Sequence, residues 1–356
     1  MIPEEQLEKF REALQSCSNP VFFFDNDVDG LAAFLILRKF CGKGRGVAIK
    51  SYPSLGHQYI RKLDEFNPDI IFVLDKNSIS SEFIKAAKEK NLRIFWLDHH
   101  PRPIEASDPC VEYLNPLINL PKDNRPTAYW AYHIAKNKEY EWIALSGCIW
   151  DWFVPEFAEE FSQNNPELFQ HTKNAARALY ETPMGKITRI LAFALKDKTS
   201  AIVRMIKILL EVNTANQVNE ENKKLQPIFK RYNQINNRYQ RLLEKGQDIA
   251  SRSSKLLFFQ YGGELSLSGD LANELFYKYP EKIVVVTYIH MNKVNCSMRG
   301  LIDVRDLIKK ALQGIESSSG GHENAVGATF QAQDLRRFRS NIFHLLSKLE
   351  TPQKNA

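Results

Sequence analysis

The feature of this sequence that constrains the fold most is an apolar run that leads directly into three aspartates at alternate positions. Residues 21–24 are all apolar, which is typical of a strand buried on both faces of a sheet. Asp25, Asp27 and Asp29 follow at once, and the mainly apolar segment 31–40 after them predicts a packed helix. The aspartates therefore fall in a strand-to-helix turn at the carboxyl end of a strand, where open α/β sheets bind ligands.

The three carboxylates of this turn lie within five residues and have no basic residue between them. Because like charges repel, a bound divalent cation would neutralise them, and hard cations prefer oxygen ligands. The turn could equally be an acidic surface loop, since aspartate and glycine are common in turns of any kind. This window alone leaves both interpretations open.

Two further predicted strands carry acids or histidines where they end. Residues 69–74 predict a buried strand that ends on Asp75, and residues 92–97 predict another that ends on the Asp-His-His sequence 98–100. With helices between the strands, this pattern predicts a doubly wound, mainly parallel α/β sheet with one polar site along its edge. Independent surface turns would not repeat this placement, so the recurrence favours a metal site. Other elements predicted in this domain are helices at 2–15, 60–66, 80–90 and 129–136 and a strand at 47–52.

Length and composition narrow the class of protein. The chain has 356 residues, enough for two or three domains, and a net charge of +6 that tolerates a polyanionic partner without demanding one. Its five cysteines include no CxxC pair, which argues against a disulfide framework or a structural zinc and fits a reducing cytoplasm. No apolar run approaches the length of a membrane span, so we expect no membrane association.

The polar residues at the strand ends have a common chemistry. Asp27, Asp29, Asp75 and a histidine form a mixed carboxylate and imidazole set, which suits Mn²⁺ or Mg²⁺ better than an ion that prefers thiolates. Two such ions close together can activate a water molecule and stabilise the departing oxygen of a phosphoester. Asp151 follows a mostly apolar helix predicted at 142–150, and by itself it is equally an acid at a helix end.

The second half of the chain predicts a smaller α/β domain joined to the first by helices. We expect a first domain at 1–195, a helical linker at 196–250 and a second domain at 251–350. The elements predicted there are helices at 201–212, 227–245, 271–279, 304–312 and 335–349 and strands at 255–261, 282–290 and 293–298.

The linker helix at 227–245 has two possible roles, and we expect it to end at Gly246. It carries several cations that we expect to be exposed, interleaved with Tyr232 and Tyr239. These cations are Lys230, Arg231, Arg238, Arg241 and Lys245. The helix is either a solvated connector or one wall of a surface that follows a nucleic-acid backbone, with tyrosines available for stacking.

The strand-end motifs resemble those of a known family, the DHH phosphoesterases. The sequence Asp25-Asn26-Asp27-Val28-Asp29-Gly30, then Asp75, then Asp98-His99-His100, then Asp151, is similar to the four motifs of that family. The acidic turn looks most like the DxDxDG pattern of the RecJ-like branch. Residues 320–327 are similar to the GGHxxAAG signature of the DHH-associated domain, with Val326 in place of an alanine. The resemblance covers nearly the whole chain.

The resemblance implies roles for individual residues. The implied ligands of two Mn²⁺ or Mg²⁺ ions are Asp25, Asp27, Asp29, Asp75, His99 and Asp151, with Asp25 completing or supporting the site. The carboxylate of Asp75 could bridge both ions, Asp98 would orient His99, and His100 would face the scissile phosphate; these three are the implied catalytic residues. The implied substrate-binding residues are Arg299, Gly320, Gly321 and His322, together with Thr127, for which a helix cap is the simpler alternative.

The glycine segment has a physical use that fits this assignment. Glycines let the backbone approach a phosphate, and we expect the amino end of a helix beyond them to favour the anion. The segment could also be an ordinary helix-capping turn.

The resemblance implies a metal-dependent phosphodiesterase that hydrolyses single-stranded DNA or RNA from an end, as RecJ-like exonucleases do. One alternative is an enzyme of short substrates, namely oligoribonucleotides, cyclic dinucleotides or phosphoadenosine phosphate. Another is a replication-fork scaffold, since relatives in this branch bind GINS.

Overall fold

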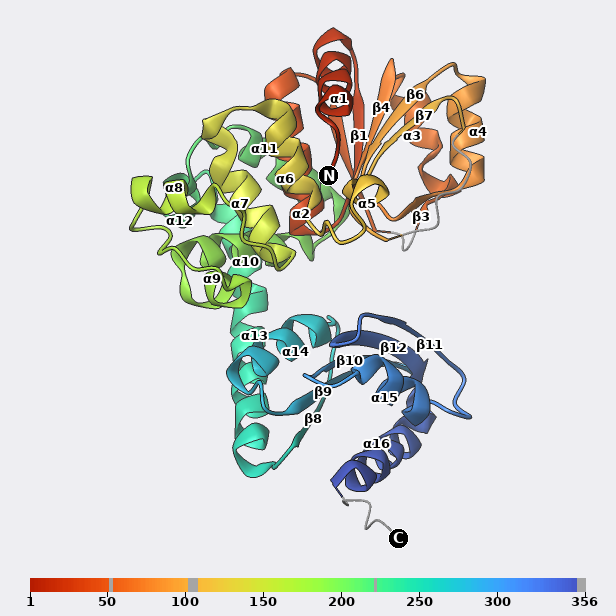
Figure 1. Ribbon diagram of the computed structural model, residues 1–356, viewed down its shortest axis with the longest axis vertical. Helices are drawn as coiled ribbons and strands as arrows, with labels where there is room; N and C mark the ends of the chain where they lie inside the picture. The colour runs from red at the N-terminus through yellow and green to blue at the C-terminus, as the bar shows by residue number, and fades with distance from the viewer. Residues whose placement is uncertain (51–53, 102–107, 221–222, 351–356) are drawn as a thin grey trace. The chain divides into compact units, whose positions relative to one another are not determined.

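The computed structural model describes residues 1–50, 54–101, 108–220 and 223–350. By contacts, the chain divides into two units, Met1–Asn233 and Gln234–Ala356 (Figure 1). A long helix, α13 (Gln226–Arg252), contains the boundary between them. The three-part division into 1–195, 196–250 and 251–350 remains a prediction.

The first unit is built on a five-stranded parallel sheet, as the sequence predicts. Its strands are β1 (Val21–Asp25), β2 (Arg45–Ile49), β4 (Ile70–Leu74), β6 (Arg93–Leu97) and β7 (Val111–Leu114). They lie in the order β2-β1-β4-β6-β7, with every pairing parallel. Because the chain winds outward in both directions from the neighbouring strands β1 and β4, their carboxyl ends flank the crevice where doubly wound sheets bind ligands.

Alternate residues of β1 pack against helices on opposite faces of the sheet (Figure 1). Phe22 and Phe24 contact the ring of Phe34 on α2 (Val28–Cys41), and Phe22 stacks on Phe72. Phe23, on the other face, contacts Phe83 on α4 (Ser81–Glu89). Burial on both faces explains why the strand reads as an unbroken apolar run.

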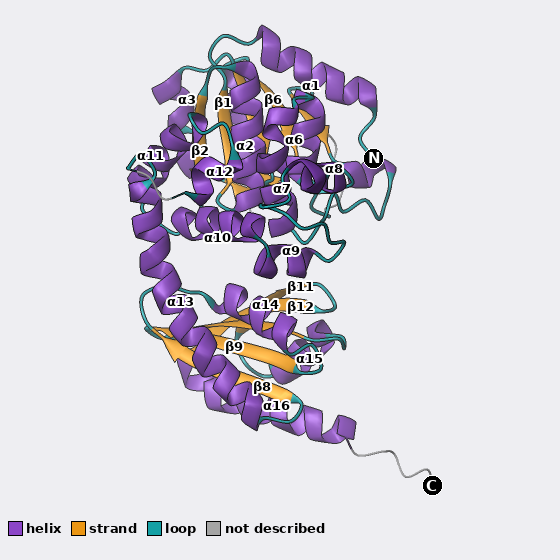
Figure 2. Ribbon diagram, turned by 90° about the vertical axis from the view of Figure 1, so that its left-hand side faces the viewer, coloured by secondary structure: helices purple, strands orange, loops and turns teal. Residues whose placement is uncertain are grey.

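The remaining elements of the first unit are mainly helical (Figure 2). On the α2 side, α6 and α7 pack against α2 and against each other. Their bounds, with those of the other elements, are α1 (Glu4–Ser16), β3 (Ser54–Leu55), α3 (Arg61–Phe66), β5 (Ser78–Ile79), α5 (Pro116–Asn119), α6 (Thr127–Ala135), α7 (Glu141–Trp150), α8 (Ala158–Asn164), α9 (Ala175–Glu181), α10 (Pro183–Leu195), α11 (Thr199–Leu210) and α12 (Ala215–Asn219).

The second unit is a mixed five-stranded sheet with helices on its faces, which confirms a smaller α/β domain. Its strands have the order β11-β12-β10-β9-β8, and β8 and β9 form its parallel pair. One apolar core joins the sheet to α15 and α16, while α14 packs on β9 and β10. The bounds are β8 (Leu256–Gly262), α14 (Ser268–Lys278), β9 (Ile283–His290), β10 (Lys293–Arg299), α15 (Val304–Ala311), β11 (Ser317–Gly321), β12 (Ala325–Gln331) and α16 (Leu335–Glu350).

The helix predicted at 227–245 differs from the structure in length and in exposure. It does not end at Gly246 but continues as α13 to Arg252. A Cβ at Gly246 would lie 2.9 Å from the side chain of Leu275, so this glycine allows close helix packing instead of ending the helix. Tyr232 and Tyr239 are buried, which removes them as stacking surfaces.

The glycine segment also differs from the prediction. Gly320 and Gly321 end β11, and residues 325–331 form β12, which pairs antiparallel with β11. The segment is therefore a strand–turn–strand connection that leads directly into β12 and not into the amino end of a helix. Residues 51–52 of the predicted strand 47–52 lie outside the described residues. Among the described residues, no helix combines the length and apolar content needed to cross a membrane.

Candidate functional site

The acidic turn is held by the start of α2. Asp27 is the N-cap of this helix, and its carboxylate accepts a hydrogen bond of 3.0 Å from the backbone N–H of Gly30. Gly30 packs so closely on β1 that a Cβ there would lie 2.6 Å from the carbonyl oxygen of Asp25. The glycine of the motif is therefore required by packing, and it fixes the direction of the aspartates.

Asp29 is fully buried and is anchored by a second helix. Its two carboxylate oxygens accept hydrogen bonds of 2.8 Å from the backbone N–H groups of Thr127 and Ala128, at the start of α6. The amino end of a helix stabilises negative charge, so α6 keeps this carboxylate in place. Thr127 is the first residue of α6, with Pro126 at the N-cap, so it is not a helix cap. Its hydroxyl instead donates to Asp75 over 3.2 Å.

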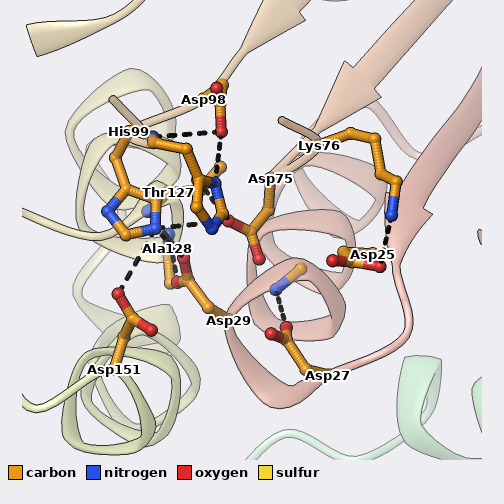
Figure 3. Close-up of polar contacts among 12 residues, drawn as sticks. Asp25, Asp27, Asp29, Asp75, Lys76, Asp98, His99, Thr127, Ala128 and Asp151 are labelled. Atoms are coloured by element: carbon orange, nitrogen blue, oxygen red, sulfur yellow. Dashed lines mark hydrogen bonds and ion pairs between the residues drawn. The ribbon is translucent and has the colours of Figure 1, made fainter. Parts of the chain in front are cut away.

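Three carboxylates converge on one nitrogen of His99 (Figure 3). Its Nε2 atom lies 3.3 Å from Asp151, 3.4 Å from Asp75 and 3.9 Å from Asp29. Two sets of side chains present ligand atoms close enough to share a metal ion, and both contain His99. These sets are Asp29–His99–Asp151 and Asp75–His99–His100. The structure thus brings together residues from the first turn of α2 and from the ends of β4, β6 and α7.

Asp98 contacts His100, whereas the family resemblance implied that it would orient His99. The Nδ1 atom of His100 lies 2.8 Å from Oδ1 of Asp98. The other oxygen of Asp98 accepts a hydrogen bond of 3.2 Å from Tyr113, and Asn115 donates to the carbonyl of His100 over 3.0 Å. Although burial opposes it, the hydrogen bond to Asp98 raises the pKa of His100 to about 9. The chain thus holds this imidazole in one orientation and favours its protonated form.

Asp25 lies beside these clusters and has a partner that sequence reasoning missed. The ammonium of Lys76 lies 3.0 Å from its Oδ1 atom, and the lysine side chain is almost completely buried. Lys76 directly follows Asp75 at the end of β4, and its carbonyl accepts a hydrogen bond from the indole of Trp96. The sequence feature that could have indicated this pair is a lysine directly after Asp75, at a strand end where other strands carry aspartates.

The carboxylates of the site are destabilised in their charged form. Burial, followed by the charges of Asp25 and Asp29, raises the pKa of Asp27 to about 7. Burial and the nearby Asp151 raise the pKa of Asp29 to about 6. Burial also raises the pKa of Asp75 well above its ordinary value. A divalent cation would relieve this repulsion, so the donor set fits an Mn²⁺ or Mg²⁺ ion.

The residues predicted to bind substrate in the second unit lie at one end of its sheet. Arg299 on β10 pairs with Ala325 on β12, and Gly321 on β11 pairs with Val326 beside it. The guanidinium of Arg299 donates to the side chain of Asn273 over 2.6 Å, which fixes its direction. Gly320 and His322 are exposed, and a Cβ at Gly320 would meet nothing within 4 Å.

Family models match both units. The model described as "DHH family, N-terminal domain" matches residues 21–148, and that of the DHHA1 domain matches residues 254–348. Together they cover more than half of the chain. Among proteins with curated descriptions, none matches this sequence.

Solved structures share the fold at low sequence identity. RecJ from Thermus thermophilus in complex with Mn²⁺ has a TM-score of 0.66 at 14% identity over 97% of this chain and 54% of its own length. This chain therefore spans about half of that protein. A manganese-bound exonuclease RecJ has a TM-score of 0.63 at 15% identity over 98% of this chain and 95% of its own. CDC45 from Entamoeba histolytica has a TM-score of 0.52 at 10% identity over 95% of this chain and 97% of its own length.

These likenesses establish the fold, and the family models establish the relationship. The acidic turn and the Asp-His-His sequence fall within the residues matched by the first model, and residues 254–348 of the second unit are matched by the second. The chain therefore belongs to the DHH superfamily and has the fold of its RecJ-like branch, a DHH domain followed by a DHHA1 domain.

Proposed function

We propose that this protein is a metal-dependent phosphodiesterase that hydrolyses single-stranded nucleic acid from an end. The observation that carries the proposal is the convergence of Asp29, Asp75 and Asp151 on Nε2 of His99 at the carboxyl edge of the sheet. Buried carboxylates with raised pKa values cluster at functional sites, because folding alone does not favour them.

The residues that would hold the metal are those predicted from the sequence: Asp25, Asp27, Asp29, Asp75, His99 and Asp151. Their oxygens and one imidazole suit Mn²⁺ or Mg²⁺, and two ions remain the prediction. Bound there, such ions would supply an activated water and neutralise the charge of a phosphodiester.

The chain's own residues would position the substrate. The hydrogen bond to Asp98 raises the pKa of His100 to about 9, which favours the protonated imidazole that would donate a hydrogen bond to a phosphoryl oxygen. Asp98 occupies its Nδ1 atom, which leaves Nε2 for the substrate. The carboxylate of Asp75 accepts a hydrogen bond from the hydroxyl of Thr127, which would hold this carboxylate in place beside His99.

The second unit would bind a phosphate group of the substrate. Arg299 supplies a fixed positive charge, and the open backbone at Gly320 and Gly321 allows close approach of an anion. His322 follows them on the exposed turn between β11 and β12.

A second candidate is an enzyme of short substrates, such as oligoribonucleotides, cyclic dinucleotides or phosphoadenosine phosphate. It is favoured by α13, whose tyrosines are buried and whose Arg238 donates to the carbonyl of Gly262. This helix therefore has fewer groups available to contact the bases and phosphates of a long strand than its sequence indicates. GINS as a partner and a cytoplasmic location remain predictions.

The proposal is tested by incubating the protein with end-labelled single-stranded DNA and RNA of graded length, in Mn²⁺, Mg²⁺ or EDTA. We expect turnover in Mn²⁺ or Mg²⁺, none in EDTA, and stepwise shortening of a long strand from one end. Asp75→Asn should abolish turnover and keep the fold, because asparagine tolerates the left-handed backbone at this position, where φ is 57°.

The matched control is Asp64→Asn, which changes a surface aspartate paired with Lys90 and should leave turnover unchanged. Full turnover by Asp75→Asn in EDTA would overturn the proposal. Cleavage restricted to dinucleotides would favour the short-substrate enzyme. Binding of nucleic acid with no turnover in any metal would favour a scaffold.

A further inference from the structure

An exposed tryptophan directly follows Asp151. The side chain of Trp152 is 44% exposed, and its φ angle of 60° places it in the left-handed region. Tryptophan is usually largely buried, and bulky residues rarely adopt positive φ. Trp152 thus departs from two folding preferences at once, beside a residue of the candidate metal site.

The backbone at this position is a helix ending that normally takes glycine. The N–H of Phe153 bonds the carbonyl of Cys148 over 2.9 Å, and the N–H of Trp152 bonds that of Ile149 over 3.2 Å. These two bonds define a Schellman motif at the end of α7, and Trp152 occupies its left-handed position. Glycine or asparagine would complete this turn with less strain, so the turn does not explain the tryptophan.

The residue that precedes Trp152, Asp151, extends its side chain toward His99 of the candidate metal site. Oδ2 of Asp151 lies 3.3 Å from Nε2 of His99. Because consecutive Cα atoms are about 3.8 Å apart, the backbone of Trp152 lies directly beside a residue of the candidate metal site. Its ring has a neighbour in Tyr180 on α9, with ring centroids 6.4 Å apart. The helices α7 and α9, which lie next to these two residues, pack together (Figures 1 and 2).

We propose that Trp152 stacks on the nucleobase of the nucleotide whose phosphate is cleaved at this site. The inference rests on the proposed function and adds to it a base-binding position. A planar, exposed ring held on a rigid helix end is suited to stacking, which accepts every base because each has a π face. The strain at this residue is then explained by substrate binding, since strained backbone persists where function requires it.

The test measures the interaction between Trp152 and a base directly. Fluorescence anisotropy gives the Kd of labelled oligonucleotides in Ca²⁺, with a single abasic residue placed at each position near either end. For the wild-type protein we expect one abasic position to weaken binding roughly 10-fold, as loss of a base–aromatic stack does. Trp152→Asn should bind the complete strand as weakly as the wild-type protein binds that abasic strand. Its Kd values for the complete strand and for the abasic strand should be equal. Its melting temperature should be equal or higher, because asparagine suits the left-handed position.

The control is Met291→Asn, which also replaces an exposed apolar residue with positive φ, on the turn between β9 and β10. It should leave both Kd values unchanged. If wild type and Trp152→Asn show the same abasic dependence, the stacking inference is wrong while the proposed function stands. If the wild-type protein neither binds nor cleaves any strand, the proposed function itself fails.

Discussion

The ammonium of Lys76 lies 3.0 Å from Oδ1 of Asp25, and 2% of the lysine side chain is exposed. The pair places a permanent positive charge at the rim of a cluster of buried carboxylates. A buried lysine is costly unless it is paired, so its presence here indicates that the metal-free site needs a counter-charge.

We predict that Lys76→Met lowers the stability of the metal-free protein by roughly 2 kcal/mol, the value of a hydrogen bond between charged groups. Mn²⁺ should restore most of this loss, because it replaces the missing positive charge. Thermal unfolding in EDTA and in Mn²⁺ measures both effects. Lys90→Met, which breaks a surface pair with Asp64, is the control and should change little. An equal response to Mn²⁺ in wild type and Lys76→Met would show that Lys76 does not serve as a counter-charge.

The second prediction concerns pH. Asp27 and Asp29 have folded-state pKa values raised to about 7 and about 6 from 3.8, so the folded protein binds protons more tightly than the unfolded chain. Their contribution to stability therefore falls as pH rises from about 4 to about 7. His100, with a pKa raised to about 9 from 6.5, loses its own contribution between those values. All three act in the same direction.

We thus expect the melting temperature of the metal-free protein to decrease from pH 5 to pH 9. Saturating Mn²⁺ should oppose this decrease, and Mn²⁺ affinity should increase over the same range because ligands must be deprotonated to bind. Unfolding scans and calorimetry at each pH provide the measurement. A metal-free protein that becomes more stable between pH 6 and pH 9 would contradict the prediction.

The edge of the sheet that carries the site could be predicted from the sequence for a topological reason. Parallel strands end on one edge, so Asp29, Asp75 and His99 had to meet once their strands were identified. The individual partners could not be predicted, because they depend on side-chain direction. One oxygen of Asp98 contacts Nδ1 of His100 while the other accepts a hydrogen bond from Tyr113, an arrangement that the sequence alone does not indicate.

The helix α13 shows that apolar periodicity predicts which of its side chains are buried. Apolar residues recur along it every three or four positions, which is the pattern of a buried stripe. That stripe is Ile228, Tyr232, Ile235, Tyr239 and Leu243. The tyrosines belong to it, and Tyr239 donates its hydroxyl to the buried Glu274 over 2.6 Å. Their position between cations suggested stacking, but periodicity was the stronger indicator.

The third prediction tests the Asp98–His100 pair. Asp98→Asn removes the negative charge that keeps His100 protonated, so the pKa of His100 should fall. We expect the alkaline limit of the pH–rate profile to move down from about 9 by one unit or more, with turnover reduced at neutral pH. Tyr113→Phe removes a hydrogen bond to Asp98 and keeps the charge, so its profile should stay near that of wild type. An unchanged profile in Asp98→Asn would exclude His100 as the titrating group.

The fourth prediction separates substrate binding from metal binding. Arg299→Ala and His322→Ala should each weaken binding of an oligonucleotide, roughly 10-fold for the arginine as loss of a charged hydrogen bond implies. Both should keep the Mn²⁺ affinity of wild type, since the candidate metal ligands lie in the first unit. Calorimetry with Mn²⁺ and anisotropy with the oligonucleotide measure the two separately. Arg305→Ala, on α15 of the same unit, is the control. Loss of Mn²⁺ binding in either variant would refute this division of roles.

The last prediction concerns the cations of α13. Arg231 and Arg238 donate to backbone carbonyls, which leaves Lys230, Arg241 and Lys245 exposed to solvent. If α13 is a connector, replacing these three by glutamine should leave the salt dependence of strand binding unchanged. If it follows a strand, log Kd against log salt should flatten by roughly 0.7 for each lost phosphate contact. We expect no change, because the tyrosines of the helix are buried and cannot stack on bases, and two of its arginines already donate to backbone carbonyls. A slope that flattens by two contacts or more would make α13 part of the nucleic-acid interface, and would favour the exonuclease over the short-substrate enzyme.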